Sequence, residues 1–332
     1  MLEIDASFGE GGGQIVRTAA ALSALTGQSV RLSRIRQGRP RPGLAAQHVK
    51  AIQMLAEICK AKTRGLAVGS GDVEFQPGPV RGGRYHADIG TAGSVTLLIQ
   101  CLLPALSSAD GPVEISVRGG TDVQWSPTFD YLRNVALPAF CSFGLSASVE
   151  LITRGYYPRG GGHVLLKVKP SGICAADLSR IDGDVLGISH SSGLPQHVSS
   201  RQASAAVKHL EAAGRKALVS CDVQSGQSTG SGITLWCGWK GASALGARGL
   251  PAEDVGRQAA EELLQELSSS AAVDVRLADQ LVPYLAVGGG SFSVREISSH
   301  TRTNLWTVCQ FLEHEVRVEQ RDGLSLISAP GL

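Results

Sequence analysis

Residues 154–164 read RGYYPRGGGHV, and this stretch is the most informative one in the 332-residue chain. Two arginines flank a proline here, and three glycines follow at once. Proline fixes its own φ angle, whereas glycine reaches positive φ and lets another backbone pass close by. Basic side chains beside backbone amides also suit an anion such as phosphate. Two interpretations stay open: a tight turn that leads into a strand over His163–Pro170, or an anion site that includes Arg154 and Arg159.

Outward from this stretch, a local pattern recurs in which a glycine or serine cluster opens a helix and strand-like segments follow. Its copies are Gly9–Gly13 before Ile15–Leu25, Gly90–Gly93 before Val95–Leu106, Gly119–Gly120 before Pro127–Phe143, and Ser298–Ser299 before His300–Leu312. Serine, glycine and proline are common where helices begin. Such self-similarity predicts repeated α/β units that share sheets and helices, so we expect a mixed α/β (α+β) fold.

The middle of the chain leaves this pattern. It contains a Ser-rich stretch over Ser189–Gln202 that we interpret as a loop, with Ala-rich helical and strand-like stretches after it. An amphipathic helix over Pro251–Ser268 follows, with a proline and two acidic residues at its start, as helix N-termini favour. We therefore expect a smaller inserted α/β domain over residues 176–271. The main domain is then discontinuous and consists of residues 1–175 and 272–332.

Composition limits the class of protein. The formal charge is only +2, which excludes a polybasic nucleic-acid coat and leaves anion binding to local clusters. The seven cysteines form no CxxC pair, so buried thiols in a reducing compartment are favoured over structural zinc or a disulfide framework. We see no charged-then-apolar leader and no apolar run long enough for a membrane span, so we expect a cytoplasmic protein.

The run GEGGGQIVR at residues 9–17 is the first candidate for phosphate binding. It is no P-loop, but its amides precede a helix N-terminus, where anions are favoured. Glu10 among them would repel a bare phosphate, so it indicates a divalent cation between its carboxylate and phosphate oxygens. Arg17 lies one helical turn further on and can reach the same anion. The alternative is a plain glycine-rich turn capped by Glu10.

His300 opens a helix in the run SSHTRTN at residues 298–304. The positive end of the helix dipole disfavours the imidazolium form, so the ring stays neutral and nucleophilic. A neutral imidazole can attack phosphorus and form a phosphoramidate. A histidine with a purely structural role is the alternative.

Three further polar clusters are candidates for a site. Arg276–Gln280 precedes an apolar run and suits a ribose, a base or a metal, although from the residues alone a surface loop is preferred. Gln47 and His48 follow the basic loop Arg31–Arg41. The run GGTDVQWSP at residues 119–127 contains Trp125, which is either a stacking platform for a base or, more commonly, a buried anchor for the next helix.

These runs, in the same order and across nearly the whole chain, resemble those of the RNA 3'-terminal phosphate cyclase family. The matching runs are GEGGGQIVR (9–17), RQGRPRPGLAAQH (36–48), GGTDVQWSP (119–127), RGYYPRGGGHV (154–164), LADQ (277–280) and HTRTN (300–304). Gln124 stands where a proline is commoner. The resemblance implies a main domain of repeated βαβαββ units, similar to the C-terminal domain of translation initiation factor three, with a smaller α/β insert.

The resemblance also implies an ATP-dependent reaction at RNA 3'-phosphate ends. His300 would attack the α-phosphorus of ATP, release pyrophosphate and carry AMP. The AMP would then pass to the RNA 3'-phosphate, and the neighbouring 2'-hydroxyl would close a 2',3'-cyclic phosphate. ATP is thus the co-substrate, and Mg²⁺ or Mn²⁺ would balance the charge at phosphorus. A monomer and a homodimer both stay open.

The residues that the resemblance assigns to a site carry over by position. His300 is the implied nucleophile, Glu10 and Arg17 the implied triphosphate contacts, and Glu10 also the metal ligand. The implied ATP pocket consists of Gln47, Gln100, Pro127, Arg276, Leu277, Ala278, Asp279 and Gln280. The implied contacts to the RNA phosphate or to pyrophosphate are Arg36, Arg39 and Arg41. The 154–164 run is then tight packing before the insert, away from the reacting atoms.

Two other functions fit a chain of this type. A cyclase-like RNA-binding or ribosome-assembly factor would share the fold but lack the nucleophilic histidine, and His300 together with Glu10 and Arg17 argues against it. An enzyme of similar repeat fold that acts on small metabolites, such as an enolpyruvyl transferase, is the second. The runs at 154–164 and 300–304 argue against that one.

Overall fold

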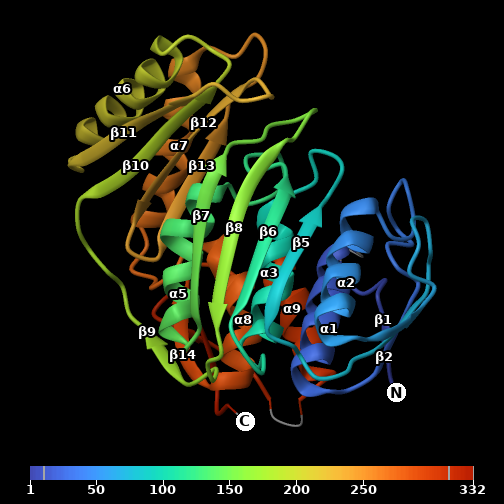
Figure 1. The fold of residues 1–332 in the computed structure, drawn as a ribbon. Coiled ribbons are helices and arrows are strands. Elements are labelled where there is room, and N and C mark those ends of the chain that lie inside the picture. The colour runs from blue at the N-terminus through green and yellow to red at the C-terminus, as the bar shows by residue number, and fades with distance from the viewer. Residues whose placement is uncertain (10–11, 313–314, 332) are drawn as a thin grey trace.

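The computed structural model describes residues 1–9, 12–312 and 315–331. Its first unit is a βαβαββ arrangement built from β1 (Leu2–Asp5), α1 (Gly13–Thr26), β2 (Val30–Ser33), α2 (Ala46–Cys59), β3 (Lys62–Arg64) and β4 (Val73–Gln76). The strands lie in the order β1-β2-β4-β3 (Figure 1). The pair β1 and β2 is parallel, and the other pairs are antiparallel.

The second and third units repeat this arrangement with the same strand order. The second consists of β5 (Gly83–Asp88), α3 (Val95–Leu106), β6 (Val113–Gly119), the helical segments α4 (Phe129–Tyr131), η1 (Leu132–Ala136) and α5 (Leu137–Ser142), then β7 (Ser146–Thr153) and β8 (Gly162–Lys169). The third consists of β9 (Ala176–Leu178), α8 (Val275–Gly288), β14 (Gly290–Val294), α9 (Ser299–Cys309), β15 (Arg317–Arg321) and β16 (Leu324–Ala329). The orders are β5-β6-β8-β7 and β9-β14-β16-β15.

A separate α/β layer is inserted between β9 and α8. It contains β10 (Val185–Ser192), α6 (His197–Ala212), β11 (Ala217–Gln224), β12 (Gly230–Cys237), β13 (Lys240–Leu245) and α7 (Ala252–Leu267). Its sheet has the order β11-β10-β12-β13, and α6 and α7 pack on each other and against that sheet. A small hydrophobic cluster of its own holds this layer together, from Val185 to Leu267. Figure 1 shows it at the upper left, beside β7.

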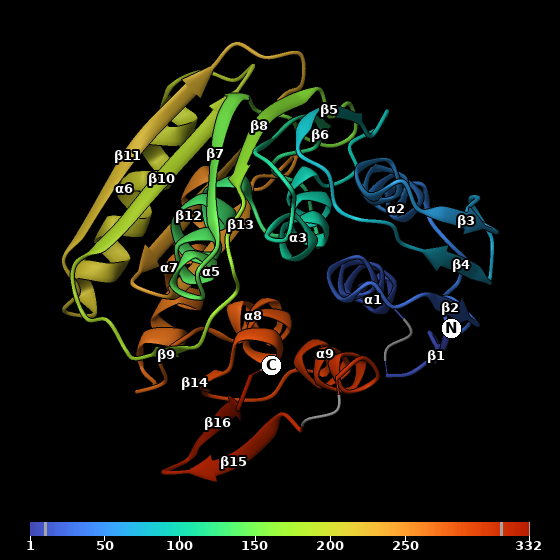
Figure 2. The same cartoon turned by 60° about the horizontal axis from the view of Figure 1, so that its bottom comes forward.

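The repeated units confirm the expected fold. Their helices share one hydrophobic core that draws residues from all three units. Figure 2 shows α1, α3, α8 and α9 nearly end-on in the centre, with the three sheets on the outside. Helix α1 packs against α3 and α9, and α8 packs against α9. The site described below lies among these four helices. None of the described helices combines the length and the apolar composition that crossing a bilayer would require.

Two details differ from the sequence-based expectations. Strand β9 pairs with β14, so residues 176–178 lie in the sheet of the third unit, and we propose an insert that begins near Val185 and not at residue 176. The loop predicted over Ser189–Gln202 is wrong, because its first residues complete β10 and its last ones begin α6. The serines mislead because they are buried: Ser189 Oγ donates to the Ser199 carbonyl at 2.8 Å inside the insert.

Candidate active site

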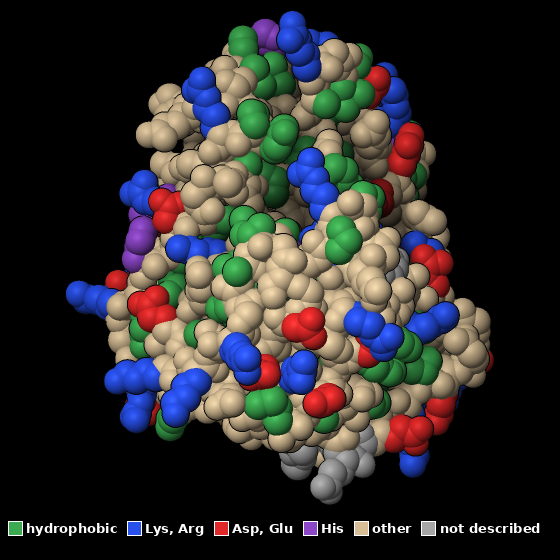
Figure 3. Space-filling view, turned by 90° about the vertical axis from the view of Figure 1, so that its right-hand side faces the viewer, with side chains coloured by type: hydrophobic (Ala, Val, Ile, Leu, Met, Phe, Trp, Pro, Cys, Tyr) green, Lys and Arg blue, Asp and Glu red, His purple; other side chains and the backbone are tan. Residues whose placement is uncertain are grey.

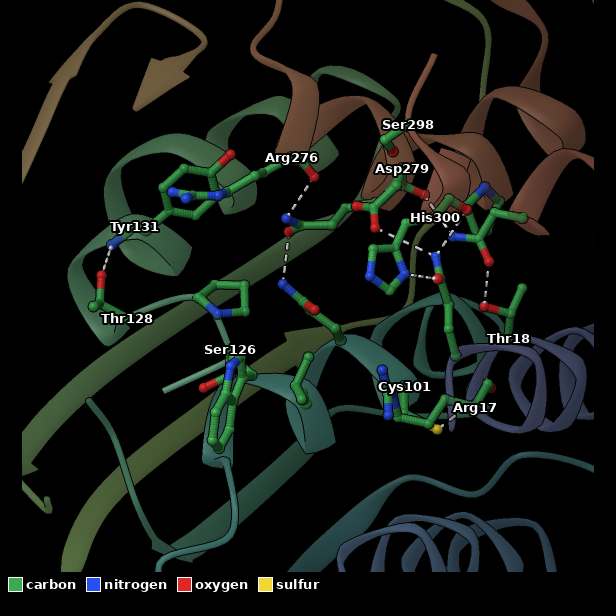
Figure 4. A pocket seen from close by; sticks show the side chains of 18 of the residues that line it. Arg17, Thr18, Cys101, Ser126, Thr128, Tyr131, Arg276, Asp279, Ser298 and His300 are labelled. Carbon is green, nitrogen blue, oxygen red and sulfur yellow. Dashed lines mark hydrogen bonds between the residues drawn. The ribbon is translucent and has the colours of Figure 1, made fainter. Parts of the chain in front are cut away.

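A cavity of about 750 Å³ opens among the central helices, the turn after β6 and the end of β13. Seven of the residues expected in a site line it, namely Arg17, Gln100, Pro127, Arg276, Asp279, Gln280 and His300. Figure 4 shows His300, Asp279 and Arg17 on one side, with Ser126, Thr128 and Tyr131 opposite them. Segments that are far apart in the sequence thus place a histidine, an arginine, a carboxyl group and several amides around one space.

His300 is held at the first turn of α9. The Ser298 hydroxyl accepts a hydrogen bond from the Thr301 amide at 3.0 Å, which caps the helix and starts it at Ser299. His300 Nδ1 forms a short hydrogen bond with Gln14 Oε1, from the first turn of α1. The first turns of two helices therefore meet at this ring.

Gln14 fixes the tautomer of the His300 ring. Its Nε2 donates to the His300 carbonyl at 3.2 Å and to Asp279 Oδ2 at 3.3 Å, so its Oε1 faces the ring as an acceptor. An acceptor requires the proton of the imidazole to be on Nδ1. Nε2 then carries the lone pair, which is the atom that can attack an electrophile.

A hydrogen-bonded chain joins the helices around this pair. Asn304 Nδ2 donates to the Asp279 carbonyl at 2.7 Å, and Thr18 Oγ1 donates to Asn304 Oδ1 at 2.9 Å. The chain runs from α1 through α9 to α8, so it fixes the distance between Gln14, His300 and Asp279. Side chains that are locked in this way keep a site in one geometry without a cost at the moment of reaction.

Asp279 is the carboxyl group that α8 brings to the cavity. Burial and, to a smaller extent, the nearby charge of Asp274 raise its pKa to about 7 against the opposing effect of Arg17. The group is thus close to half-protonated at neutral pH.

The raised pKa of Asp279 predicts how stability depends on pH. In the unfolded chain this group has an ordinary pKa near 3.8, so the folded state binds more protons between about pH 4 and pH 7 and loses stability as pH rises through that window. Asp279→Asn removes this loss. The free energy of unfolding of the variant, relative to that of the wild type, should therefore be on the order of 2 kcal/mol higher at pH 8 than at pH 5. Urea unfolding at both pH values measures this, and an equal difference at both would contradict it.

Gln100 and Gln280 form an amide pair at the far end of the cavity. Gln100 Nε2 donates to Gln280 Oε1 at 2.6 Å, and Gln280 Nε2 donates to the Arg276 carbonyl at 2.8 Å. Arg276 itself forms an ion pair with Glu262 of α7, which connects the cavity to the insert. Pro127 lies near them, its carbonyl accepting from Thr96 Oγ1 at 2.7 Å. An apolar proline ring and fixed amides in one cavity suit a ligand with an apolar face and a hydrogen-bonding edge, such as a base.

Arg17 and Arg36 provide positive charge near His48, whose ring lies at the N-terminus of α1. His48 is buried, its Nδ1 accepts from the Ala45 amide at 3.1 Å, and its pKa falls to about 3 because of burial and of Arg17 and Arg36 nearby. Its ring fills the space beside Gly13, where an added Cβ would lie 1.9 Å from His48 Nε2. His48 thus lies at the N-terminus of α1 with two cations near its ring, and a helix N-terminus is a favourable place for phosphate.

The remaining expected site residues do not line the cavity. Leu277 and Ala278 are fully buried in the core, on the face of α8 that turns away from the ligand space. Gln47 lies in the first turn of α2, and the loop before that helix carries Arg36, Arg39 and Arg41, the first of which donates to the Gly43 carbonyl at 2.8 Å. Glu10, the expected metal ligand, lies outside the described residues.

The 154–164 run has a structural role. Arg154 is only 2% exposed and contacts Asp222, Asp130 and Asp122 at 2.8, 2.9 and 3.2 Å. An anion site at Arg154 is therefore wrong, because three carboxylates already occupy the guanidinium group. Close backbone packing is confirmed, since a Cβ at Gly155 would lie 2.2 Å from the Gly162 nitrogen.

Sequence reasoning missed Gln14 as a site residue. It lies within the run at residues 9–17, but the interpretation of that run as a phosphate site rested on the charged residues Glu10 and Arg17. The signal was its position: three residues before Arg17, it lies in the turn of α1 that meets α9. A neutral amide at the N-terminus of a helix that also carries a candidate phosphate site is worth testing as an orienting group.

The chain is similar to known proteins over nearly its whole length. A family described as RNA 3'-terminal phosphate cyclase matches residues 8–318. A curated protein of that name from Methanosarcina barkeri is 52% identical over 329 residues, which is 99% of either chain. Relatives with the same name from Archaeoglobus fulgidus and Pyrococcus furiosus are 50% and 47% identical. They cover 96% and 94% of this chain and 98% and 93% of their own lengths.

Proposed function

Because this chain belongs to the RNA 3'-terminal phosphate cyclase family, we propose that it uses ATP to convert an RNA 3'-terminal phosphate into a 2',3'-cyclic phosphate. The observation that carries the proposal is the hydrogen bond between His300 Nδ1 and Gln14, because it favours the tautomer with the proton on Nδ1 and the lone pair on Nε2, in a cavity that Arg17 also lines. A non-catalytic RNA-binding factor would have no use for this arrangement.

The first step joins AMP to the enzyme. His300 Nε2 attacks the α-phosphorus of ATP, a P–N bond forms, and the bond to the bridging oxygen breaks so that pyrophosphate leaves with the electron pair. Positive charge develops on the imidazole, and Gln14 Oε1 stabilises it by accepting a hydrogen bond from Nδ1–H. Arg17 supports the negative charge that gathers on the phosphate oxygens. The base of ATP would lie between Pro127 and the amide pair of Gln100 and Gln280.

The next two steps occur at the RNA end. An oxygen of the terminal 3'-phosphate attacks the phosphorus of the histidine-bound AMP, and His300 Nε2 leaves as neutral imidazole. The resulting anhydride carries a good leaving group. The 2'-hydroxyl then attacks the terminal phosphorus, loses its proton, and displaces AMP. Because this hydroxyl is already beside its target, effective molarity supplies much of the acceleration.

A divalent cation, Mg²⁺ or Mn²⁺, belongs to the proposal as a counter-charge for the phosphates. Among the described residues Asp279 is the carboxyl group that lines the cavity, and its raised pKa makes it a weak ligand at neutral pH. The ion would therefore depend on Glu10 and on the phosphates of the nucleotide. Arg36, Arg39 and Arg41 would meet the RNA phosphate or pyrophosphate. On the face that Figure 3 draws, lysines and arginines are interspersed with acidic side chains. Together with the net charge of only +2, this favours binding of RNA through local groups such as the three arginines.

Labelled ATP tests this function directly. With α-labelled ATP and Mg²⁺, the protein should acquire acid-labile, alkali-stable label, as a phosphoramidate does. An RNA with a 3'-phosphate should then become resistant to phosphatase and release labelled AMP. The same RNA with a 2'-deoxy terminal sugar should stop at the adenylated end, because it lacks the attacking hydroxyl. An RNA end that stays sensitive to phosphatase would overturn the proposal.

A further inference from the structure

Trp125 is the most exposed of the large apolar side chains in the described part of the chain, with 95% of its surface open to solvent. It nevertheless lines the cavity that contains His300. An indole ring in water forgoes the gain that burial would bring, and tryptophan is a frequent anchor in binding sites for this reason. The expected buried anchor is therefore wrong, and the ring is available to a ligand.

The backbone holds this ring outward. Trp125 has a φ of +61°, a left-handed conformation that bulky residues rarely adopt. Such conformations persist where the surroundings determine them, and they gather at binding sites. The turn is fixed on both sides: the Thr121 amide donates to the Gly155 carbonyl at 2.8 Å, and the Phe129 amide donates to the Thr121 carbonyl at 3.0 Å. Within it, Ser126 Oγ donates to the Val123 carbonyl at 3.0 Å. The Trp125 ring is thus exposed on a turn that hydrogen bonds hold in place.

The chemistry of the cavity favours a base of the RNA as the partner of this ring. The amide pair and Pro127 offer hydrogen-bonding groups and an apolar contact for the base of ATP. Trp125 is almost wholly open to solvent, so it stands where a polymer would arrive. Every base has a face that stacks on an aromatic ring, so such a platform holds any RNA end without reading its sequence.

We propose that Trp125 stacks on a base at the 3' end of the RNA and thereby directs the terminal phosphate toward His300. The proposal rests on the function proposed above. It assigns the 121–128 turn, in addition to the basic loop, to the path of the RNA. It also makes Trp125 a positioning residue for the second and third steps, whereas labelling by ATP alone needs no RNA.

The test compares Trp125→Ala and Trp125→Phe with Tyr157→Ala, a matched control at a 77% exposed aromatic residue that does not line the cavity. Trp125→Ala should raise KM for a 3'-phosphorylated RNA about 5- to 100-fold, the usual range for loss of one stacked base, and Trp125→Phe should restore most of the affinity. Labelling by ATP alone should change less than about twofold, within the range of a residue that does not contact the nucleotide. Tyr157→Ala should match the wild type.

A second RNA completes the test, with ribo-abasic residues at its last two positions. It should bind the wild type more weakly than ordinary RNA, and Trp125→Ala should bind both RNAs alike. Direct binding without ATP keeps this readout separate from catalysis, so it decides the role of Trp125 even if no cyclic end forms. An unchanged RNA affinity in Trp125→Ala would overturn the proposal. A loss confined to labelling by ATP would assign the ring to the nucleotide instead, and would overturn it too.

Discussion

His300→Ala is expected to abolish the transfer of AMP to the protein and to lower the rate of cyclisation at least about 10³-fold. The variant loses the atom that forms the P–N bond, and no other imidazole lines the cavity within the described residues. Alanine is also a good helix former, so α9 should keep its capped first turn. Acid-labile label from α-labelled ATP measures the first step, and release of AMP from 3'-phosphorylated RNA measures the sequence of steps.

Two further variants sharpen this result. His209→Ala, on the outer helix α6 of the insert, should label like the wild type, because that side chain is partly exposed and does not line the cavity. Gln14→Leu should label about 10- to 100-fold more slowly, as is typical when the partner that orients a functional histidine is lost. Label that persists on His300→Ala would show that another residue is the nucleophile. A Gln14→Leu variant with full activity would show that the reactive tautomer of His300 does not depend on Gln14.

The fold was predictable to the extent that local patterns report on local structure. Glycine clusters before apolar-periodic helices identified the repeats, because helix starts and core faces leave marks within a few residues. Strand β9 was missed because three residues that pair with β14, more than a hundred positions later, carry no local signal of that pairing. The serines of β10 were misread for a related reason, since only tertiary hydrogen bonds make a buried polar strand stable.

The site was predictable where its chemistry requires a titratable side chain within a motif. It was less predictable where a residue's role depends on its tertiary neighbours. His300 and Asp279 stand in motifs that identify them, and both line the cavity. Leu277 and Ala278 came with the same motif, but a helix turns consecutive residues to different faces, and theirs is the core. Arg154 looked like an anion contact because its partners lie in segments that the sequence does not place beside it.

Arg154→Met is expected to destabilise the protein by about 3–5 kcal/mol, because it removes the cation that pairs with a buried group of carboxylates. Asp122 and Asp130 come from the second unit and are almost completely buried, while Asp222 comes from strand β11 of the insert. His190 is buried beside them, but its pKa falls to about 3 through burial and the nearness of Arg154, so it adds no charge at neutral pH. Arg154→Lys should lose a large part of the same stability, because one ammonium group cannot contact all three carboxylates as the guanidinium group does.

The dependence of this loss on pH separates a lost charge from lost packing. With Arg154 in place, burial already raises the pKa of Asp130 to about 6, while the pKa of Asp122 stays below the ordinary 3.8. The guanidinium lowers the pKa of both groups, so its loss raises both, and the folded variant binds protons that its unfolded chain does not. Its stability relative to the wild type should therefore fall as pH rises from about 4 to 7, and urea unfolding at pH 5 and pH 8 measures the gap. Arg159→Met, an exposed change in the same run, should stay within about 0.5 kcal/mol of the wild type at both.

A gap that is equal at both pH values would assign the role of Arg154 to its packing alone. A gap that widens with pH has a consequence for the site, because Asp122 and Asp130 stand on either side of the turn that carries Trp125 and Pro127. The Gly155 carbonyl, next to Arg154, accepts from the amides of Thr121 and Asp122 at 2.8 and 3.2 Å. The buried charges therefore connect the insert to the cavity wall, and their loss should raise KM for RNA in the variant that still folds.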